Sequence, residues 1–131
     1  MSDLPKLDDE QLRQLAQQSR AIGEDCNCIT ADASGWISLP LSLPEQQLQD
    51  IGTLLQDPYV EPTFAEYHPA ATRYESAQAP VAPRHFPYNR CNAARCAQCG
   101  RLYLRYTEAG GYFVDRRIRA LNDPELVRDP T

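Results

Sequence analysis

Three cysteines, Cys91, Cys96 and Cys99, lie within nine residues, and Gly100 follows the third. The sequence begins with no charged leader and apolar stretch of the kind that directs a chain into an oxidising compartment. Thiols this close together in a reducing compartment are more often gathered around a metal ion than joined as disulfides. The cluster therefore predicts a cytoplasmic protein that is stapled by a metal site in its second half.

The length of the chain limits what can surround that site. With 131 residues, 42% of them hydrophobic, it can form one core of ordinary size, so we predict a single domain over residues 1–131. We expect a helix–strand–helix part in residues 1–56, a proline-rich extended segment in 57–90, and the cysteine knuckle with a hairpin in 91–121. No apolar run approaches the roughly 18 residues of a membrane-spanning helix, so no membrane partner is expected.

Charge is unevenly distributed along the chain. Residues 1–65 contain 3 basic and 11 acidic residues, whereas residues 84–119 contain 8 arginines and 2 acidic residues. Two interpretations stay open. In the first, the acidic and the basic half of the chain face each other or simply face solvent. In the second, the basic half forms a surface for an anionic partner.

A helix is predicted near the N-terminus. Asp8 has the position of an N-cap, Gln11 stands three residues later as in a capping box, and Gly23 is a natural C-terminal stop. Apolar residues at helical spacing lie between them, so the pattern predicts a helix over 9–22.

The next segment predicts a strand and then a second helix. Over residues 36–43 apolar and polar residues alternate, which is typical of a half-buried strand, and Pro40 places that strand at a sheet edge or ends it. After a capping-box spacing at Ser42 and Glu45, the spacing of Leu48, Ile51 and Leu55 predicts a helix to about residue 55.

Residues 102–118 predict a β-hairpin, because apolar residues alternate on either side of Ala109-Gly110-Gly111. A three-residue loop places Tyr106 opposite Val114 and gathers the apolar residues on one face. The fold class we predict is α+β: two helices packed on a small antiparallel sheet with a metal-stapled C-terminal β-hairpin.

Cys96-Ala-Gln-Cys99-Gly100 before a hairpin resembles the zinc knuckle of zinc-ribbon proteins. In that family two thiolates three residues apart bind Zn²⁺, and the glycine permits the tight turn, so the resemblance implies a structural zinc ion. The chain is also similar to small bacterial-type proteins built around such a knuckle. The resemblance covers only the knuckle and the hairpin.

A structural zinc ion needs four ligands. Cys91 is the nearest third ligand, and His85, six residues before it, completes a Cys₃His set with Cys96 and Cys99. The alternative uses Cys26 and Cys28, which would join the first loop to the hairpin. A further interpretation is that the thiols are partly buried and hold no metal.

The C-x₄-C-x₂-C spacing is also that of plant-type [2Fe–2S] ferredoxins. That family places its fourth cysteine downstream, whereas no cysteine follows Cys99 here. The fourth ligand would have to be Cys26 or Cys28. An iron–sulfur or thiol redox protein is therefore a second alternative.

The hairpin carries the best candidates for binding a partner. Its arginines and aromatic residues are of the types that contact proteins and that grip phosphates and stack on bases; they are Arg101, Tyr103, Arg105, Phe113, Arg117 and Arg119. No catalytic constellation and no small-molecule site are evident. We therefore predict a zinc-stabilised interaction protein without catalytic activity, whose partner is another protein, with a nucleic-acid-binding zinc ribbon as the first alternative.

Overall fold

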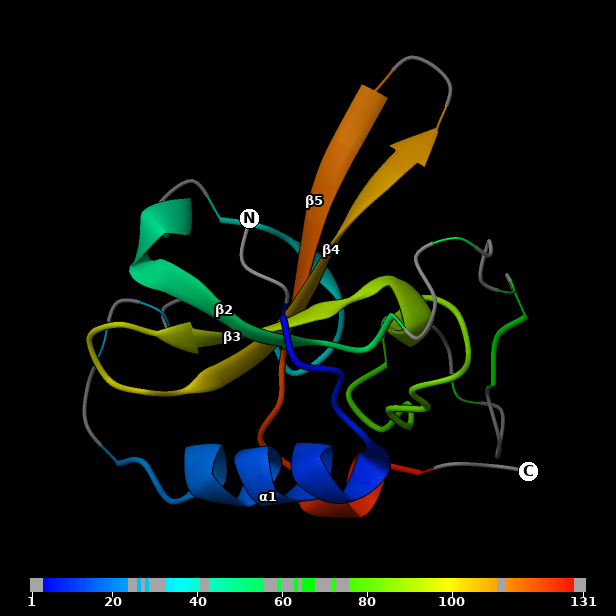
Figure 1. Cartoon of the computed structure of the whole chain (residues 1–131). Helices are drawn as coiled ribbons and strands as arrows, with labels where there is room; N and C mark the ends of the chain where they lie inside the picture. Colours follow the sequence, from blue (N-terminus) through cyan, green and yellow to red (C-terminus); the bar gives the residue numbers. More distant parts are fainter. Residues whose placement is uncertain are drawn as a thin grey trace.

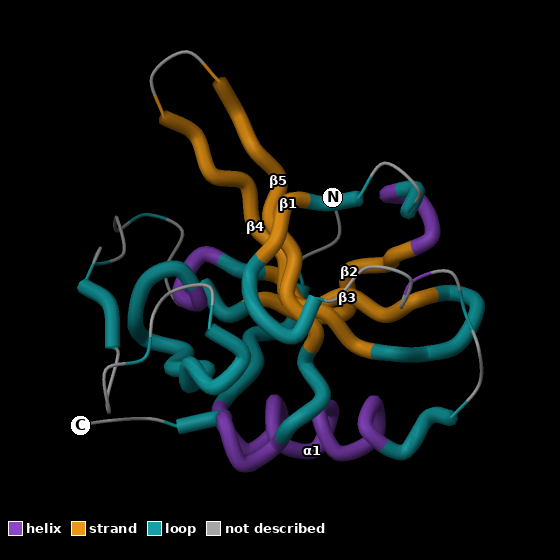
Figure 2. Tube along the Cα trace, turned by 180° about the vertical axis from the view of Figure 1, so that it is seen from behind, coloured by secondary structure: helices purple, strands orange, loops and turns teal. Residues whose placement is uncertain are grey.

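The computed structural model describes residues 4–23, 26, 28, 33–40, 43–55, 59, 63, 65–67, 72, 76–110 and 113–128. Within this part, one α-helix lies beside a five-stranded antiparallel sheet with the strand order β1-β5-β4-β3-β2 (Figures 1 and 2). The strands are β1 Ile37–Ser38, β2 Leu48–Thr53, β3 Asn92–Cys96, β4 Leu102–Gly110 and β5 Phe113–Ala120. The molecule is mostly sheet, so the prediction of two helices packed on a small sheet is wrong.

The first predicted helix is confirmed as α1, Asp9–Arg20. Asp8 accepts a hydrogen bond from the Gln11 amide at 2.8 Å, and the Gln11 side chain accepts one from the Asp8 amide at 2.9 Å. Leu12 and Ala16 are buried beneath the sheet (Figure 1). Among the described residues, no helix has both the length and the apolar character needed to cross a membrane.

The second predicted helix is replaced by a short 3₁₀ helix, η2 (Glu45–Gln47), and by strand β2. A register shift between Asp50 and Gly52, where β2 pairs with β3, adds a bulge to this strand. In a strand, residues three apart point to opposite faces, so Leu48 packs in one core cluster while Ile51 packs against the other, on the opposite face. Residues three apart therefore do not share a helical face here.

The predicted strand over 36–43 is shorter than expected, but it lies at the edge of the sheet, as Pro40 predicted. β1 ends at Ser38, two residues before the proline, and pairs only with β5 at the edge of the sheet. Leu39 adds one further hydrogen bond from its amide to the Arg116 carbonyl, at 2.8 Å. Residues 41 and 42 lie outside the described part.

The hairpin is confirmed, but its predicted register is wrong. Tyr103 pairs with Ala120 and Gly110 pairs with Phe113, so two residues, 111 and 112, connect the strands instead of three; both lie outside the described part. The prediction assumed that only one face of the hairpin is buried. In fact both faces are covered at its base, because Leu102 and Leu104 lie in one core cluster and Tyr103 and Ile118 in the other.

The sheet thus separates two cores. The cluster on the α1 face contains large apolar residues such as Leu12, Leu54 and Leu104. The cluster on the other face is smaller and includes Cys28 and Cys96. Beyond both cores, the far ends of β4 and β5 project as an arm (Figures 1 and 2).

Candidate metal centre

Four cysteines come together at one end of the sheet: Cys26, Cys28, Cys96 and Cys99. Their four sulfur atoms all lie within 4.8 Å of one another. Across the two segments, the Sγ atoms of Cys26 and Cys96 are 3.7 Å apart and those of Cys28 and Cys99 are 3.5 Å apart. The group could hold a metal ion between two segments that are far apart in the sequence, since Cys26 and Cys96 are separated by 70 residues.

The turn between β3 and β4 positions Cys96 and Cys99. Cys96 is the last residue of β3, its carbonyl accepts a hydrogen bond from the Gly100 amide at 2.9 Å, and its amide donates to the Arg101 carbonyl at 2.8 Å. Gly100 has a φ of 87°, a backbone conformation that residues other than glycine rarely adopt. The glycine therefore lets the chain turn tightly enough to bring both thiols to one point.

Contacts with β4 hold the segment that carries Cys26 and Cys28. The Tyr103 hydroxyl donates to the Cys28 carbonyl at 3.1 Å, and the Arg101 Nη2 donates to the Ile22 carbonyl at 3.1 Å. Tyr103 belongs to β4, and Arg101 directly precedes that strand. The two cysteine segments are thus tied together by protein contacts as well as by the arrangement of their thiols.

Gln47 is a site residue for which the sequence offers no spacing signal. Its Nε2 lies 3.4 Å from the Cys96 Sγ and 3.7 Å from the Cys26 Sγ. Its carbonyl accepts a hydrogen bond from the Ala97 amide at 2.7 Å. Gln47 therefore connects η2 to the knuckle and donates to two sulfur atoms, which suits thiolates better than thiols.

The pKa values of the Cys96 and Cys28 thiols are shifted in opposite directions. Burial opposes ionisation of Cys96, but hydrogen bonds from Gln47 and from the backbone amides of Cys99 and Gln98 outweigh it and lower the pKa of Cys96 to about 6. Burial raises the pKa of Cys28 to about 12, and the neighbouring Cys99 and Cys26 add to that rise. The fold therefore favours the thiolate of Cys96, whereas a bound cation would be needed to ionise Cys28 near neutral pH.

The sulfur positions match a single tetrahedral ion. With zinc–sulfur bonds of about 2.3 Å, a regular tetrahedron places its sulfur atoms about 3.8 Å apart. The distances of 3.5 and 3.7 Å across the group are close to that value. Around such an ion, four thiolates would fill the tetrahedral positions and leave none for water, as is typical of a structural metal site.

The other two residues of the predicted Cys₃His set lie outside this group. Cys91 is fully buried in the cluster on the α1 face, where its thiol donates to the Pro87 carbonyl at 3.3 Å and burial raises its pKa well above the ordinary range. The His85 ring lies 5.6 Å from the Tyr67 ring. Cys91 and Cys96 are an odd number of residues apart along an extended segment, so they face opposite sides of the sheet.

The predicted partner-binding residues are divided between the surface and the interior. Tyr103 is only 2% exposed, and Arg119 is only 1% exposed. Arg119 donates to the carbonyls of Ser34 at 3.2 Å and Ala79 at 2.6 Å and to the Tyr88 hydroxyl. Arg101, Arg105 and Arg117 are partly exposed, and the side chain of Phe113 lies outside the described part.

Comparisons of the chain with models of protein families, with curated proteins and with solved structures found no match. The four-cysteine group therefore stands on its own geometry.

Proposed function

We propose that this chain is a zinc-stabilised binding protein without catalytic activity, in which Cys26, Cys28, Cys96 and Cys99 hold one structural Zn²⁺. The observation that carries the proposal is the convergence of four sulfur atoms within 4.8 Å of one another. These distances suit the size and tetrahedral preference of zinc, and thiolates are among its favoured ligands. When bound, the ion would contribute its binding energy directly to folding.

The same distances favour one ion over an iron–sulfur cluster. A cluster with two irons holds its four thiolates as two pairs on opposite sides, so some sulfur atoms stand farther apart than around a single ion. The upper limit of 4.8 Å between any two sulfur atoms leaves little room for such a cluster. We therefore place the iron–sulfur alternative behind zinc.

The binding role follows from where the ion would lie. Four protein ligands enclose it, so it would supply no open position for a substrate or an activated water. Its effect would instead be to fix β3 and β4, because Cys96 ends β3 and Cys99 lies in the turn before β4. We infer that the surface held by those strands, and not the metal, contacts the partner.

Metal analysis of the freshly purified full chain, combined with its visible spectrum, tests the proposal. We expect about one equivalent of zinc per chain and no absorption band in the visible range. A brown protein containing iron would replace the proposal with a redox function. Less than a tenth of an equivalent of any metal, in protein that melts identically with and without chelator, would contradict the metal site itself.

A further inference from the structure

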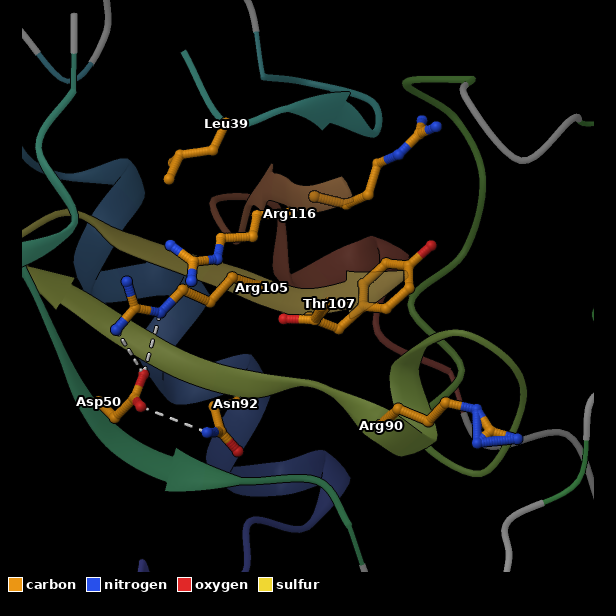
Figure 3. Close-up of a pocket in the computed structure, with 9 residues that line it drawn as sticks. Leu39, Asp50, Arg90, Asn92, Arg105, Thr107 and Arg116 are labelled. Carbon is orange, nitrogen blue, oxygen red and sulfur yellow. Dashed lines mark hydrogen bonds and ion pairs between the residues drawn. The ribbon is translucent and has the colours of Figure 1, made fainter. Parts of the chain in front are cut away.

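A pocket of about 520 Å³ opens between the β2–β3 pair and the β4–β5 arm (Figure 3). Its volume lies within the range of roughly 300–1,000 Å³ that is usual for small-molecule sites. Residues from separate elements line it, so no contiguous motif marks it in the sequence. The pocket is distinct from the four-cysteine group, none of whose members lines it.

The pocket is strongly basic. Four arginines line it, whereas Asp50 is the one acidic residue among its described lining residues; the arginines are Arg90, Arg105, Arg116 and Arg117. Counted over these lining residues alone, four positive charges and one negative charge leave a net charge of +3 in a chain whose overall net charge is -5. Two of the four arginines are in ion pairs: Arg105 with Asp50 at 2.9 Å, and Arg117 with Asp115, which does not line the pocket, at 2.7 Å. Such a local excess, concentrated in a concave site, attracts anions.

Two of these arginines are arranged to act together. Arg105 and Arg116 belong to neighbouring strands, and because Arg116 pairs with Thr107, two residues along β4 from Arg105, both lie on the same face of the hairpin. Figure 3 shows their side chains pointing in the same direction. Arg116 is exposed and Arg105 is partly exposed, so a ligand can reach both.

Arg105 is held in place by its neighbours. Its Nε and Nη2 lie 3.1 and 2.9 Å from the Asp50 Oδ1, and Nη2 is also 3.4 Å from the Leu48 carbonyl (Figure 3). Asn92 donates to the other Asp50 oxygen at 3.3 Å. Asp50 thus orients the guanidinium and fixes its position before a ligand arrives, while Nη1 takes part in none of these contacts.

We propose that this pocket binds the phosphate group of a small phosphorylated molecule. A phosphate monoester carries close to two negative charges and three acceptor oxygens, so it can accept from the Arg105 Nη1 and from the Arg116 guanidinium together, with more charge than a carboxylate offers. A pocket of about 520 Å³ suits a small molecule better than a nucleic-acid strand, which needs an extended basic groove. Leu39 lines the pocket as well and offers apolar contact to the organic part of the ligand. This inference rests on the proposed binding function and names its ligand class.

Calorimetric titration at low ionic strength tests this inference directly. The full chain, with its metal content measured, is titrated with inorganic phosphate, with ribose 5-phosphate, with uncharged ribose and with a single-stranded oligonucleotide. We expect saturable binding of about one phosphate or ribose 5-phosphate per chain and none of ribose. Absence of saturable binding of both phosphates, or binding of a single-stranded oligonucleotide alone, would overturn the inference.

Variants identify the pocket as the site. Arg105→Gln and Arg116→Gln should each weaken phosphate binding about tenfold, since each removes one guanidinium charge and its charge-assisted hydrogen bonding to the phosphate. Arg95→Gln is the matched control, because Arg95 is exposed on β3 and does not line the pocket, and it should leave the affinity within twofold. Equal losses of phosphate affinity in all three variants would show that only the overall charge of the protein matters, and would overturn the assignment of binding to this pocket.

Metal content and melting temperature, measured on the same samples, separate this inference from the proposed function. Variants that keep wild-type metal content and melting but lose phosphate binding support the pocket. Wild-type protein that contains metal but binds neither phosphate would contradict the pocket alone. Protein without metal would contradict the proposed structural zinc, whatever it binds.

Discussion

The two faces of the central sheet are stabilised by different means. Among the described residues, 14 buried residues form one cluster on the α1 face, where the Trp36 ring packs against the rings of Tyr88 and Tyr106. In the same described part, 8 buried residues cluster on the other face, two of them cysteines of the metal group and two of them alanines. The smaller cluster of described residues buries less apolar surface than the cluster on the α1 face. Under the proposed function, a metal held by the four cysteines would add on this face to what apolar packing supplies.

Removing one metal ligand should lower the stability more than any other substitution in this series, and it should act on the sheet face opposite α1. We expect Cys99→Ser to lose bound zinc and to unfold at a much lower temperature, because structural zinc binding is worth about 10–16 kcal/mol in small domains, comparable with the whole stability of a domain at about 5–15 kcal/mol. Elemental analysis with thermal denaturation measures both effects.

Cys91→Ser is the matched control for that variant. Its hydroxyl can still donate to the Pro87 carbonyl, as the thiol does at 3.3 Å, so we expect full metal content and a small loss of stability. If Cys91→Ser lost its metal while Cys99→Ser kept it, the division between the two faces would collapse.

Leu12→Ala should damage the α1 face and leave the metal in place. Leu12 is fully buried in the α1-face cluster, and such truncations cost about 2–5 kcal/mol through lost burial and the cavity left behind. Urea denaturation gives the free energy of unfolding, with metal content measured in parallel. Gln14→Ala, at an exposed position of the same helix, is the control. Loss of metal from folded Leu12→Ala protein would show that the two faces are not separable.

Gly52→Ala tests how tightly β2 is packed on the α1 face. A Cβ at this position would lie 2.6 Å from the Leu7 Cγ, closer than packed carbon atoms tolerate. We expect a loss of about 1–3 kcal/mol from overpacking. In a Leu7→Ala background the same substitution should cost clearly less, which a double-mutant cycle of unfolding free energies would reveal. Strictly additive losses would place the strain elsewhere.

Asp8→Ala should have the smallest effect of this series, about 1 kcal/mol, because it removes one N-cap. The Asp8 carboxylate accepts from the Gln11 amide at 2.8 Å at the start of α1, and that interaction would be lost. Asp8→Asn preserves an acceptor and should remain close to wild type. If the Asp8→Asn variant had the same free energy of unfolding as the Asp8→Ala variant, the result would argue against the capping role of Asp8.

Local signals in the sequence predicted local structure well. Asp8 and Gln11 indicated the start of α1, Pro40 confined its strand to an edge, and Gly100 indicated a tight turn after Cys99. Each of these depends on neighbours within a few residues. Such features are visible in a single sequence because their physical causes are short-range.

Features that depend on tertiary pairing were not predictable in the same way. The spacing of Leu48 and Ile51 indicated a helix, but pairing with β3 made the segment a bulged strand. Proximity in sequence favoured Cys91 as a ligand, whereas the sheet separates it from Cys96 by placing the two on opposite faces. The sequence named Cys26 and Cys28 as alternative ligands but could not choose them, because spacing carries no information about a contact between residues 70 apart, such as Cys26 and Cys96.

X-ray absorption at the zinc edge of the purified protein tests the central claim most directly, because it counts the atoms bound to the ion and identifies their element. A site built from Cys26, Cys28, Cys96 and Cys99 predicts four sulfur neighbours at about 2.3 Å and no nitrogen. Three sulfur atoms with one nitrogen at about 2.0–2.1 Å would instead indicate a histidine ligand. That result would contradict the four-cysteine centre.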